Sequence, residues 1–217
     1  MVAILVVLTI IAFLAVDGII QYRRARRRQT QEGAVAEAPV IPDAPADVLL
    51  AGNHAWLRMA PGGAFRIGLD SVLAGLLGRI DEVSTLPEGS RVRAGEPFLT
   101  LQVGGRRVSL TAPVSGRLQR VNPDLDREKD DLASFAYDTW VCEIQPEELA
   151  LEGAVLRMGE AARSWLRRQL NEIQELLLNE GVAAASLPDG GLLRRGALRE
   201  ADDRVWSEFS RKFLQSS

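Results

Sequence analysis

The order of apolar and polar positions along the chain changes character three times. Residues 2–22 are almost continuously apolar, and about 21 residues at roughly 1.5 Å each span the hydrocarbon core of a bilayer. Residues 30–47 are rich in Ala and Pro without apolar periodicity, which is typical of an extended tether. Short alternating runs follow, and after Pro146 the apolar positions recur at three and four residues. These changes predict four segments: a transmembrane helix with a basic flank (1–29), a linker (30–47), a β domain (48–149) and amphipathic helices (150–217).

The charges beside the N-terminal apolar segment predict its orientation. Arg23, Arg24, Arg26, Arg27 and Arg28 follow the segment directly, whereas only the amino terminus precedes it. The positive-inside rule therefore places the C-terminal side in the cytoplasm, and this order of charges is the reverse of a cleavable signal peptide. We expect a single-pass protein of the inner (cytoplasmic) membrane, with its N-terminus outside, whose arginines also contact anionic lipid.

Asp17 lies about one turn inside the cytoplasmic end of this predicted helix. An ionised carboxylate at that depth is costly unless it is paired or reaches water. Two interpretations stay open: neutralisation near the interface by Arg23 or Arg24, or contact with a partner membrane subunit. Asp17 and the five arginines are therefore the candidate membrane and lipid contacts.

Residues 48–149 have the pattern of a compact all-β unit of five to eight strands. Gly104-Gly105 separates two alternating runs, residues 98–103 and 106–111, and a two-residue Gly-Gly turn between such runs predicts a β-hairpin. The apolar spacing over Leu69–Leu77 predicts one short helix between the strands.

The C-terminal segment predicts two amphipathic helices. The first covers residues 155–180 and ends at Gly181, and the second covers Leu198–Leu214. Their apolar faces must be buried on the β domain, on each other or on a partner, and these possibilities stay open. The candidate partner-binding residues are Trp165, Trp206, Phe209 and Phe213 on these helices, with Arg106 and Arg107 beside the hairpin turn.

Charge and composition narrow the chemistry. Residues 1–29 carry a net charge of +4 while the whole chain is at −3, so the remainder is acidic at about −7, which argues against nucleic-acid binding. Cys142 is the only cysteine and His54 the only histidine, so we expect neither an internal disulfide nor a protein-only metal site. The Gly104-Gly105 turn precedes a strand rather than a helix, unlike a phosphate loop. We expect no catalytic residues and no enzymatic activity.

A series of short motifs runs through the β domain over roughly residues 50–149. They are His54-Ala55-Trp56, Ile67-Gly68-Leu69-Asp70, Leu77-Gly78-Arg79-Ile80, Leu86 to Glu96, Ala112-Pro113-Val114-Ser115-Gly116, Val121-Asn122, Tyr137-Asp138-Thr139-Trp140 and Ile144-Gln145-Pro146. In this order and spacing the chain resembles the glycine cleavage system H protein, the lipoyl-carrying member of the biotinyl/lipoyl hybrid-sandwich families. The resemblance implies an α+β chain: one N-terminal transmembrane helix, a lipoyl-carrier-like β sandwich or barrel-sandwich hybrid, and a C-terminal helical extension that the carriers do not need.

The residue that carries the cofactor in that family is missing from this sequence. In the carriers a lysine at the hairpin tip is acylated by lipoate, and the resemblance places it at about position 105, which is Gly105 here. Arginine, which follows at 106 and 107, is not a usable acyl acceptor. The two lysines of the chain, Lys129 and Lys212, lie in other segments. We therefore expect a degenerate domain without lipoate or any other cofactor.

The anchor, the missing lysine and the added helices together predict a non-catalytic accessory or scaffold subunit. Its expected partners are the lipid bilayer and other membrane protein subunits, in a photosynthetic or respiratory electron-transfer complex, since such complexes often recruit small single-pass subunits. Two alternatives stay open. One is a membrane-tethered adaptor that binds enzymes of lipoate metabolism, and the other is a lipoyl carrier modified at an unexpected position.

Overall fold

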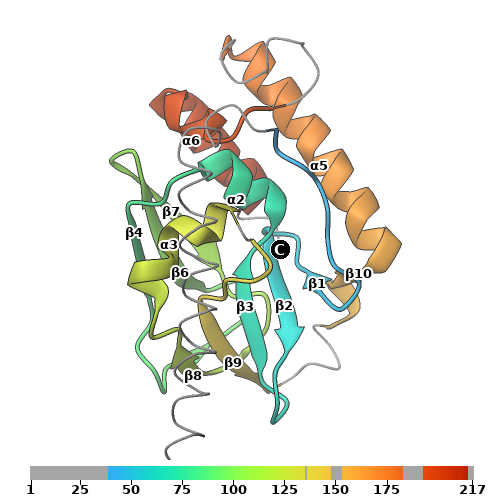
Figure 1. Cartoon of the computed structure of the whole chain (residues 1–217), viewed down its shortest axis with the longest axis vertical. Helices are drawn as coiled ribbons and strands as arrows, with labels where there is room; N and C mark the ends of the chain where they lie inside the picture. Colours follow the sequence, from blue (N-terminus) through green and yellow to red (C-terminus); the bar gives the residue numbers. More distant parts are fainter. Residues whose placement is uncertain (1–38, 135, 148–152, 183–192, 215–217) are drawn as a thin grey trace, which may run out of the picture. The chain divides into compact units, whose positions relative to one another are not determined.

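A computed structural model of the chain describes residues 39–134, 136–147, 153–182 and 193–214 (Figure 1). The predicted membrane helix and its candidate contacts lie outside the described residues and stay predictions; these contacts are Asp17, Arg23, Arg24, Arg26, Arg27 and Arg28. Among the residues that are described, no helix combines the length and the apolar character that crossing a membrane requires.

Two antiparallel sheets form the β part of the fold. The larger has the strand order β10-β1-β2-β3-β9-β8-β5 and the smaller has the order β4-β6-β7. The strands are β1 (Leu49–Leu50), β2 (Ala55–Met59), β3 (Phe65–Leu69), β4 (Glu82–Thr85), β5 (Arg91–Val92), β6 (Pro97–Val103), β7 (Arg106–Thr111), β8 (Gly116–Val121), β9 (Cys142–Pro146) and β10 (Arg157–Met158). Within residues 48–149 the structure describes nine strands, β1 to β9, against the predicted five to eight, because β1 and β5 have only two residues each and leave no alternation to detect. Strand β10 lies in the segment that was predicted to be helical.

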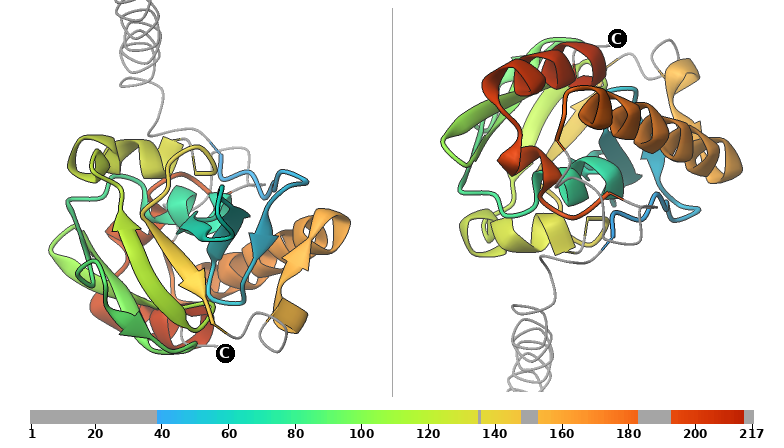
Figure 2. Two further views of the ribbon diagram at one scale, coloured as in Figure 1. Left: turned by 90° about the horizontal axis from the view of Figure 1, so that it is seen from below. Right: turned by 90° about the horizontal axis from the view of Figure 1, so that it is seen from above.

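The described helical elements are α2 (Ser71–Leu77), α3 (Leu125–Ser134), the 3₁₀ turn η2 (Gly153–Val155), α5 (Gly159–Asn179), the 3₁₀ turn η4 (Ala197–Glu200), α6 (Asp203–Phe209) and the π-helical turn η5 (Ser210–Leu214). The longer helices form two groups. Figures 1 and 2 show α5 and α6 next to each other on one side of the sheets, while α3 packs against α2 and β4.

One apolar core joins the sheets and the C-terminal helices. Trp165 on α5 and Trp206, Phe209 and Phe213 on the last helical segment are buried in it. The C-terminal helices therefore bury their apolar faces within the chain, and these four residues do not form an exposed partner surface. The core also includes Val40, whose N–H donates to the carbonyl of Leu193 (2.9 Å).

The folded unit begins at Pro39. Because Val40 and Ala44 are buried, the second half of the segment predicted as a linker over 30–47 belongs to the domain. The pattern failed here because two isolated apolar residues among Pro and Ala show no periodicity.

The predicted hairpin and the predicted short helix are present. Strands β6 and β7 pair on either side of Gly104-Gly105, and α2 begins after Asp70, whose carboxylate accepts hydrogen bonds from the N–H groups of Val72 and Leu73. An Asp at this N-cap position satisfies donors that the first turn leaves unpaired. Asp70 therefore sets where the chain turns from β3 into α2.

Three helical segments differ from the sequence prediction. The helix predicted over 155–180 starts later, at Gly159, because Arg157 and Met158 pair with β1. The helix predicted over Leu198–Leu214 is broken, since Asp202 is extended and caps α6 by accepting from the N–H of Val205. Helix α3 was not predicted, because charged residues dominate its sequence and its apolar residues form only a single contact face.

Gly116, the last residue of the Ala-Pro-Val-Ser-Gly motif, lies where two strands approach closely. A Cβ atom there would overlap the carbonyl oxygen of Gln145 and lie 2.8 Å from Cγ2 of Ile144. Strand β8 can therefore pair with β9 at this point only if residue 116 has no side chain.

Replacing Gly116 with Ala should lower the free energy of unfolding by about 3 kcal/mol, because the β8–β9 backbone must shift. Gly105→Ala is the matched control: it has open space and a φ of 81°, so it should cost only about 1 kcal/mol. Denaturant unfolding of residues 39–217 measures both. Equal losses in the two variants would contradict the close approach at Gly116.

Candidate functional site

The tip of the β6–β7 hairpin is a two-residue turn made of glycines. Gly104 and Gly105 have φ angles of 59° and 81°, and Val103 pairs with Arg106 across the turn. Two positive φ angles in succession are those of the tight turn that follows the twist of a hairpin. A Cβ atom on Gly105 would meet nothing within 4 Å, so this position faces open space.

The base of the tip is held by residues from outside the hairpin. The N–H of Gly104 donates to Oδ2 of Asp81 (2.6 Å). The guanidinium of Arg199, on η4, lies 3.6 Å from the same carboxylate and donates to the carbonyl of Arg79 (2.5 Å). Asp81 is thereby bonded to the hairpin tip and to the C-terminal extension at once.

Arg106 makes a second link from the hairpin to the extension. Its Nε donates to Oδ1 of Asp203 (2.8 Å), and one terminal guanidinium nitrogen donates to the carbonyl of Arg199 (3.4 Å). Its guanidinium carbon lies 5.9 Å from the centroid of the Trp206 ring. Its neighbour Arg107 is exposed and lies opposite Gln102 on β6. Of the two arginines predicted as partner-binding candidates, Arg106 thus contacts the chain's own extension, and Arg107 remains accessible.

The acyl acceptor of a lipoyl carrier has no counterpart at this tip. Gly105 offers no amine, and its positive φ is unfavourable for a residue with a side chain. The lipoyl group therefore does not fit the residues at the hairpin turn.

A lysine does lie near the base of the tip, in a place that the sequence did not indicate. Lys129 on α3 donates from Nζ to the carbonyl oxygen of Asp81 (2.7 Å), the residue that also bonds Gly104. Lys212 is on η5, with Nζ 5.1 Å from the ring of Phe213. Leu125 and Leu132, buried one heptad apart on α3, are the only sequence signal that could have predicted the helix that carries Lys129.

The single histidine is part of a buried pair. Nδ1 of His54 lies 2.7 Å from Oδ2 of Asp70, both side chains are fully buried, and the imidazole lies 5.0 Å from the ring of Trp165. This pair connects the start of β2 to α2 and α5, which is a structural role. Among the residues that the structure describes, no three His, Cys, Asp or Glu side chains gather as metal ligands would.

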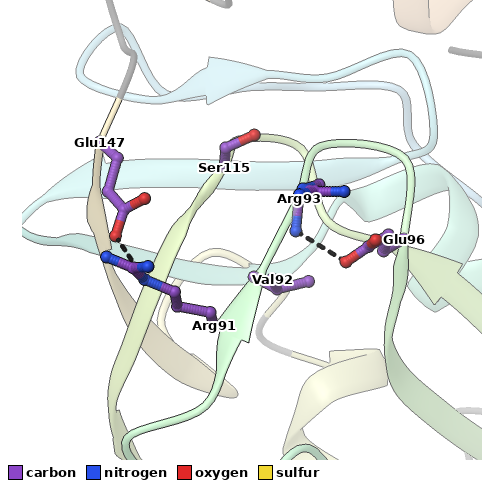
Figure 3. Close-up of a pocket in the computed structure, with 6 residues that line it drawn as sticks. All are labelled: Arg91, Val92, Arg93, Glu96, Ser115 and Glu147. Atoms are coloured by element: carbon purple, nitrogen blue, oxygen red, sulfur yellow. Dashed lines mark hydrogen bonds and ion pairs between the residues drawn. The ribbon is translucent and has the colours of Figure 1, made fainter.

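A polar cavity of about 520 Å³ lies around β5, at the end of the larger sheet (Figure 3). Its lining residues are Arg91, Val92, Arg93, Glu96, Ser115 and Glu147. Figure 3 shows Arg91 paired with Glu147 (3.2 Å) and the backbone N–H of Arg93 bonded to Glu96 (3.0 Å). The mostly apolar lining that is typical of small-molecule sites is missing, so the cavity gives no indication of a ligand.

Comparison with known proteins connects this geometry to one family. The family model described as glycine cleavage H-protein matches residues 48–168. The glycine cleavage system H protein 3 of Aquifex aeolicus (strain VF5) is 28% identical over 124 residues, 55% of this chain and 77% of the relative. The H protein of Mycobacterium tuberculosis (strain ATCC 25618 / H37Rv) is 30% identical over 123 residues, 55% of this chain and 92% of the relative. The crystal structure of an H protein from Mycobacterium marinum aligns at 26% identity and a TM-score of 0.48, covering 56% of this chain and 98% of that one.

The two sheets, the hairpin and the motif order define a β sandwich of the lipoyl-carrier type with added C-terminal helices. The chain belongs to the glycine cleavage H-protein family. The matched region continues past residue 149 through β10 and into α5, further than the motifs extend. Since β10 pairs with β1, the first part of α5 is attached to the family's sheet, whereas η4, α6 and η5 lie beyond the match.

Arg106 and Arg107 give a matched test of the link between hairpin and extension. Arg106→Gln should lower the free energy of unfolding by about 1 kcal/mol, because it removes an ion pair and an aromatic contact that are both partly exposed. Arg107→Gln, one residue further along the same strand, should change it by less than about 0.5 kcal/mol. Chemical denaturation of both variants measures this, and equal effects would contradict the role of Arg106.

Burial, together with a smaller effect of the nearby Glu143 carboxylate, raises the pKa of the Cys142 thiol to about 12. Since the thiolate is the reactive form, Cys142 should not react with a thiol reagent in the native protein at pH 8. Full labelling should appear only after unfolding in denaturant. Rapid labelling of the native protein would show that this strand opens readily.

Proposed function

We propose that this chain is a family member that carries no lipoyl group and serves as a non-catalytic, membrane-anchored accessory subunit. Its N-terminal segment crosses the inner membrane, and its cytoplasmic domain supplies a fixed surface that stabilises a membrane protein complex. The observation that carries the proposal is Gly105 at the hairpin turn, where the carriers present their acylated lysine, next to a tip whose base is bonded to the C-terminal extension.

Two physical consequences support this proposal over a carrier role. A carrier domain contributes little chemistry besides presenting its attached cofactor, so a tip without an amine removes the function. The links from Asp81 and Asp203 then restrain the hairpin against the rest of the domain. Such restraint suits a docking surface, because a pre-organised surface loses less entropy on binding.

The host complex that we propose is a photosynthetic or respiratory electron-transfer assembly, with other membrane subunits and the bilayer as partners. The absence of a catalytic role is part of the same proposal. It is supported by the buried, high-pKa thiol of Cys142 and by the buried pairing of His54 with Asp70, which leave neither side chain available as a nucleophile or a base.

Gentle detergent extraction of the native membrane tests the proposal, with an affinity tag on the C-terminus and mass spectrometry of the eluate. We expect stoichiometric membrane subunits and an intact mass without an acyl adduct. A Gly105→Lys variant, treated identically, serves as a positive control for any lipoylating enzyme in the host.

The alternatives give other results in the same experiment. A solitary chain that carries a lipoyl or octanoyl adduct would contradict the proposal, and loss of the adduct in Lys129→Arg would assign it to the amine near the tip. Co-elution of soluble lipoate-handling enzymes, without membrane subunits, would favour the adaptor instead.

A further inference from the structure

A row of charged residues crosses one face of the larger sheet. The strand registers place Arg58 opposite Arg66, Arg66 opposite Glu143, and Glu143 opposite Arg120. One register further along the same face, Gln145 lies opposite Arg117, which in turn lies opposite Arg91. Because side chains alternate between the faces of a strand, these residues all project from the same side of β2, β3, β9, β8 and β5.

Glu143 organises the centre of this row. Its Oε1 accepts a hydrogen bond from Nε of Arg66 (3.0 Å) and another from a terminal guanidinium nitrogen of Arg120 (2.7 Å). Burial raises the pKa of Glu143, but the hydrogen bonds from Arg120 and Arg66 outweigh that effect and hold the pKa below its ordinary value. Glu143 is 8% exposed, whereas the side chains of Arg66 and Arg120 are 40% and 50% exposed.

Both arginines also lie against the ring of Trp140. The guanidinium carbons of Arg66 and Arg120 lie 5.2 and 5.1 Å from the centroid of its ring. Contact with an aromatic face and a hydrogen bond to a fixed carboxylate together restrict each guanidinium to one orientation. Both groups are therefore held in place, although 40% and 50% of the two side chains remain exposed to solvent.

The face carries more positive charge than its own carboxylates neutralise. Arg58 pairs with Asp47, Arg91 pairs with Glu147, and Arg66 and Arg120 share Glu143. Among the described residues of this row, five arginines thus face the three carboxylates that pair with them, although the whole chain is at −3.

Two pairs of arginines lie directly opposite each other, Arg58 with Arg66 and Arg91 with Arg117. Like charges in such cross-strand positions destabilise a sheet. An arrangement that costs stability and leaves a local excess of positive charge is characteristic of a binding surface.

We propose that Arg66, Arg120 and Trp140 form a docking surface for an acidic segment of a partner protein, with its Asp or Glu carboxylates bonded to the two guanidinium groups. The identification of this partner as a subunit of the membrane complex rests on the proposed function, whereas the preference for carboxylates does not. A guanidinium group is suited to bind a carboxylate through two parallel hydrogen bonds. Trp140 provides an apolar surface for the methylene groups of the partner's Asp or Glu side chain. The modest excess charge argues against a nucleic acid, which needs many cationic contacts.

Titration of residues 39–217 with a hexaglutamate peptide tests this surface directly. This fragment contains every residue of the described core. NMR should show shifts of the Nε–H signals of Arg66 and Arg120 and of the indole N–H of Trp140, and hexaglutamine should shift none of them. The dissociation constant should rise about tenfold in Arg66→Gln/Arg120→Gln. Because that variant leaves a buried carboxylate without its partners, the same variant with Glu143→Gln provides a folded reference, checked by thermal unfolding.

Arg163→Gln/Arg167→Gln on α5 is the control, because it removes the same charge from another exposed face. It should keep most of the affinity for hexaglutamate. Equal weakening by the two double variants, an absence of shifts at Trp140, or binding to phosphatidylglycerol vesicles in place of the peptide would each overturn the proposal.

In the full-length tagged chain, the same variants separate this inference from the proposed function. Loss of membrane subunits from Arg66→Gln/Arg120→Gln alone would support the docking surface. Retention of those subunits would overturn it and leave the accessory role intact. If the wild-type chain brings down no subunits, the proposed function fails, and the peptide titration still decides whether the surface binds carboxylates.

Discussion

The apolar packing of the C-terminal extension against the sheets is the interaction on which the arrangement of the hairpin depends. Trp206, Phe209 and Phe213 are each at most 4% exposed, and their rings contact one another in succession, with centroids 6.5 and 5.4 Å apart. Deleting a large buried aromatic side chain costs roughly 3–5 kcal/mol. An exposed ion pair such as Arg106–Asp203 contributes about 1 kcal/mol or less. The aromatic side chains therefore attach the extension, and the polar contacts determine where the hairpin lies against it.

This attachment accounts for how a carrier-type domain can serve as a fixed surface. The hairpin that presents a cofactor in the carriers is bonded here, through Asp81 and Arg106, to a segment that lies beyond the matched family region. The extension leaves the arginine-bearing face of the larger sheet accessible, since Arg66 and Arg120 remain about half exposed. The packing that restrains one side of the domain thus leaves the arginine-bearing side exposed.

The sequence predicted those turns and helix ends that are determined by residues close to them in the chain. The hairpin follows from two glycines between alternating runs, and the end of α5 follows from Gly181, whose N–H and that of Val182 return to the carbonyls of Leu178 and Leu177. The break at Asp202 was missed because an Asp inside an apolar-periodic segment fits an exposed helix position as well as it fits a cap. The proximity of Lys129 to the hairpin depends on tertiary packing and has no counterpart in the spacing of residues.

The row of arginines could not be predicted from the sequence either. Arg66 and Arg120 lie more than fifty positions apart, and only the pairing of β3, β9 and β8 brings both of them to Glu143. A β-bulge between Leu118 and Arg120 shifts the register of β8 and places Arg120 opposite Glu143.

The backbone order parameter of the Gly104 amide in residues 39–217 tests most directly whether the hairpin tip is a fixed part of this domain. We predict a value of about 0.85, as in a rigid sheet, whereas a value below about 0.6 would show a tip that moves freely on the picosecond to nanosecond timescale and would contradict a fixed hairpin tip.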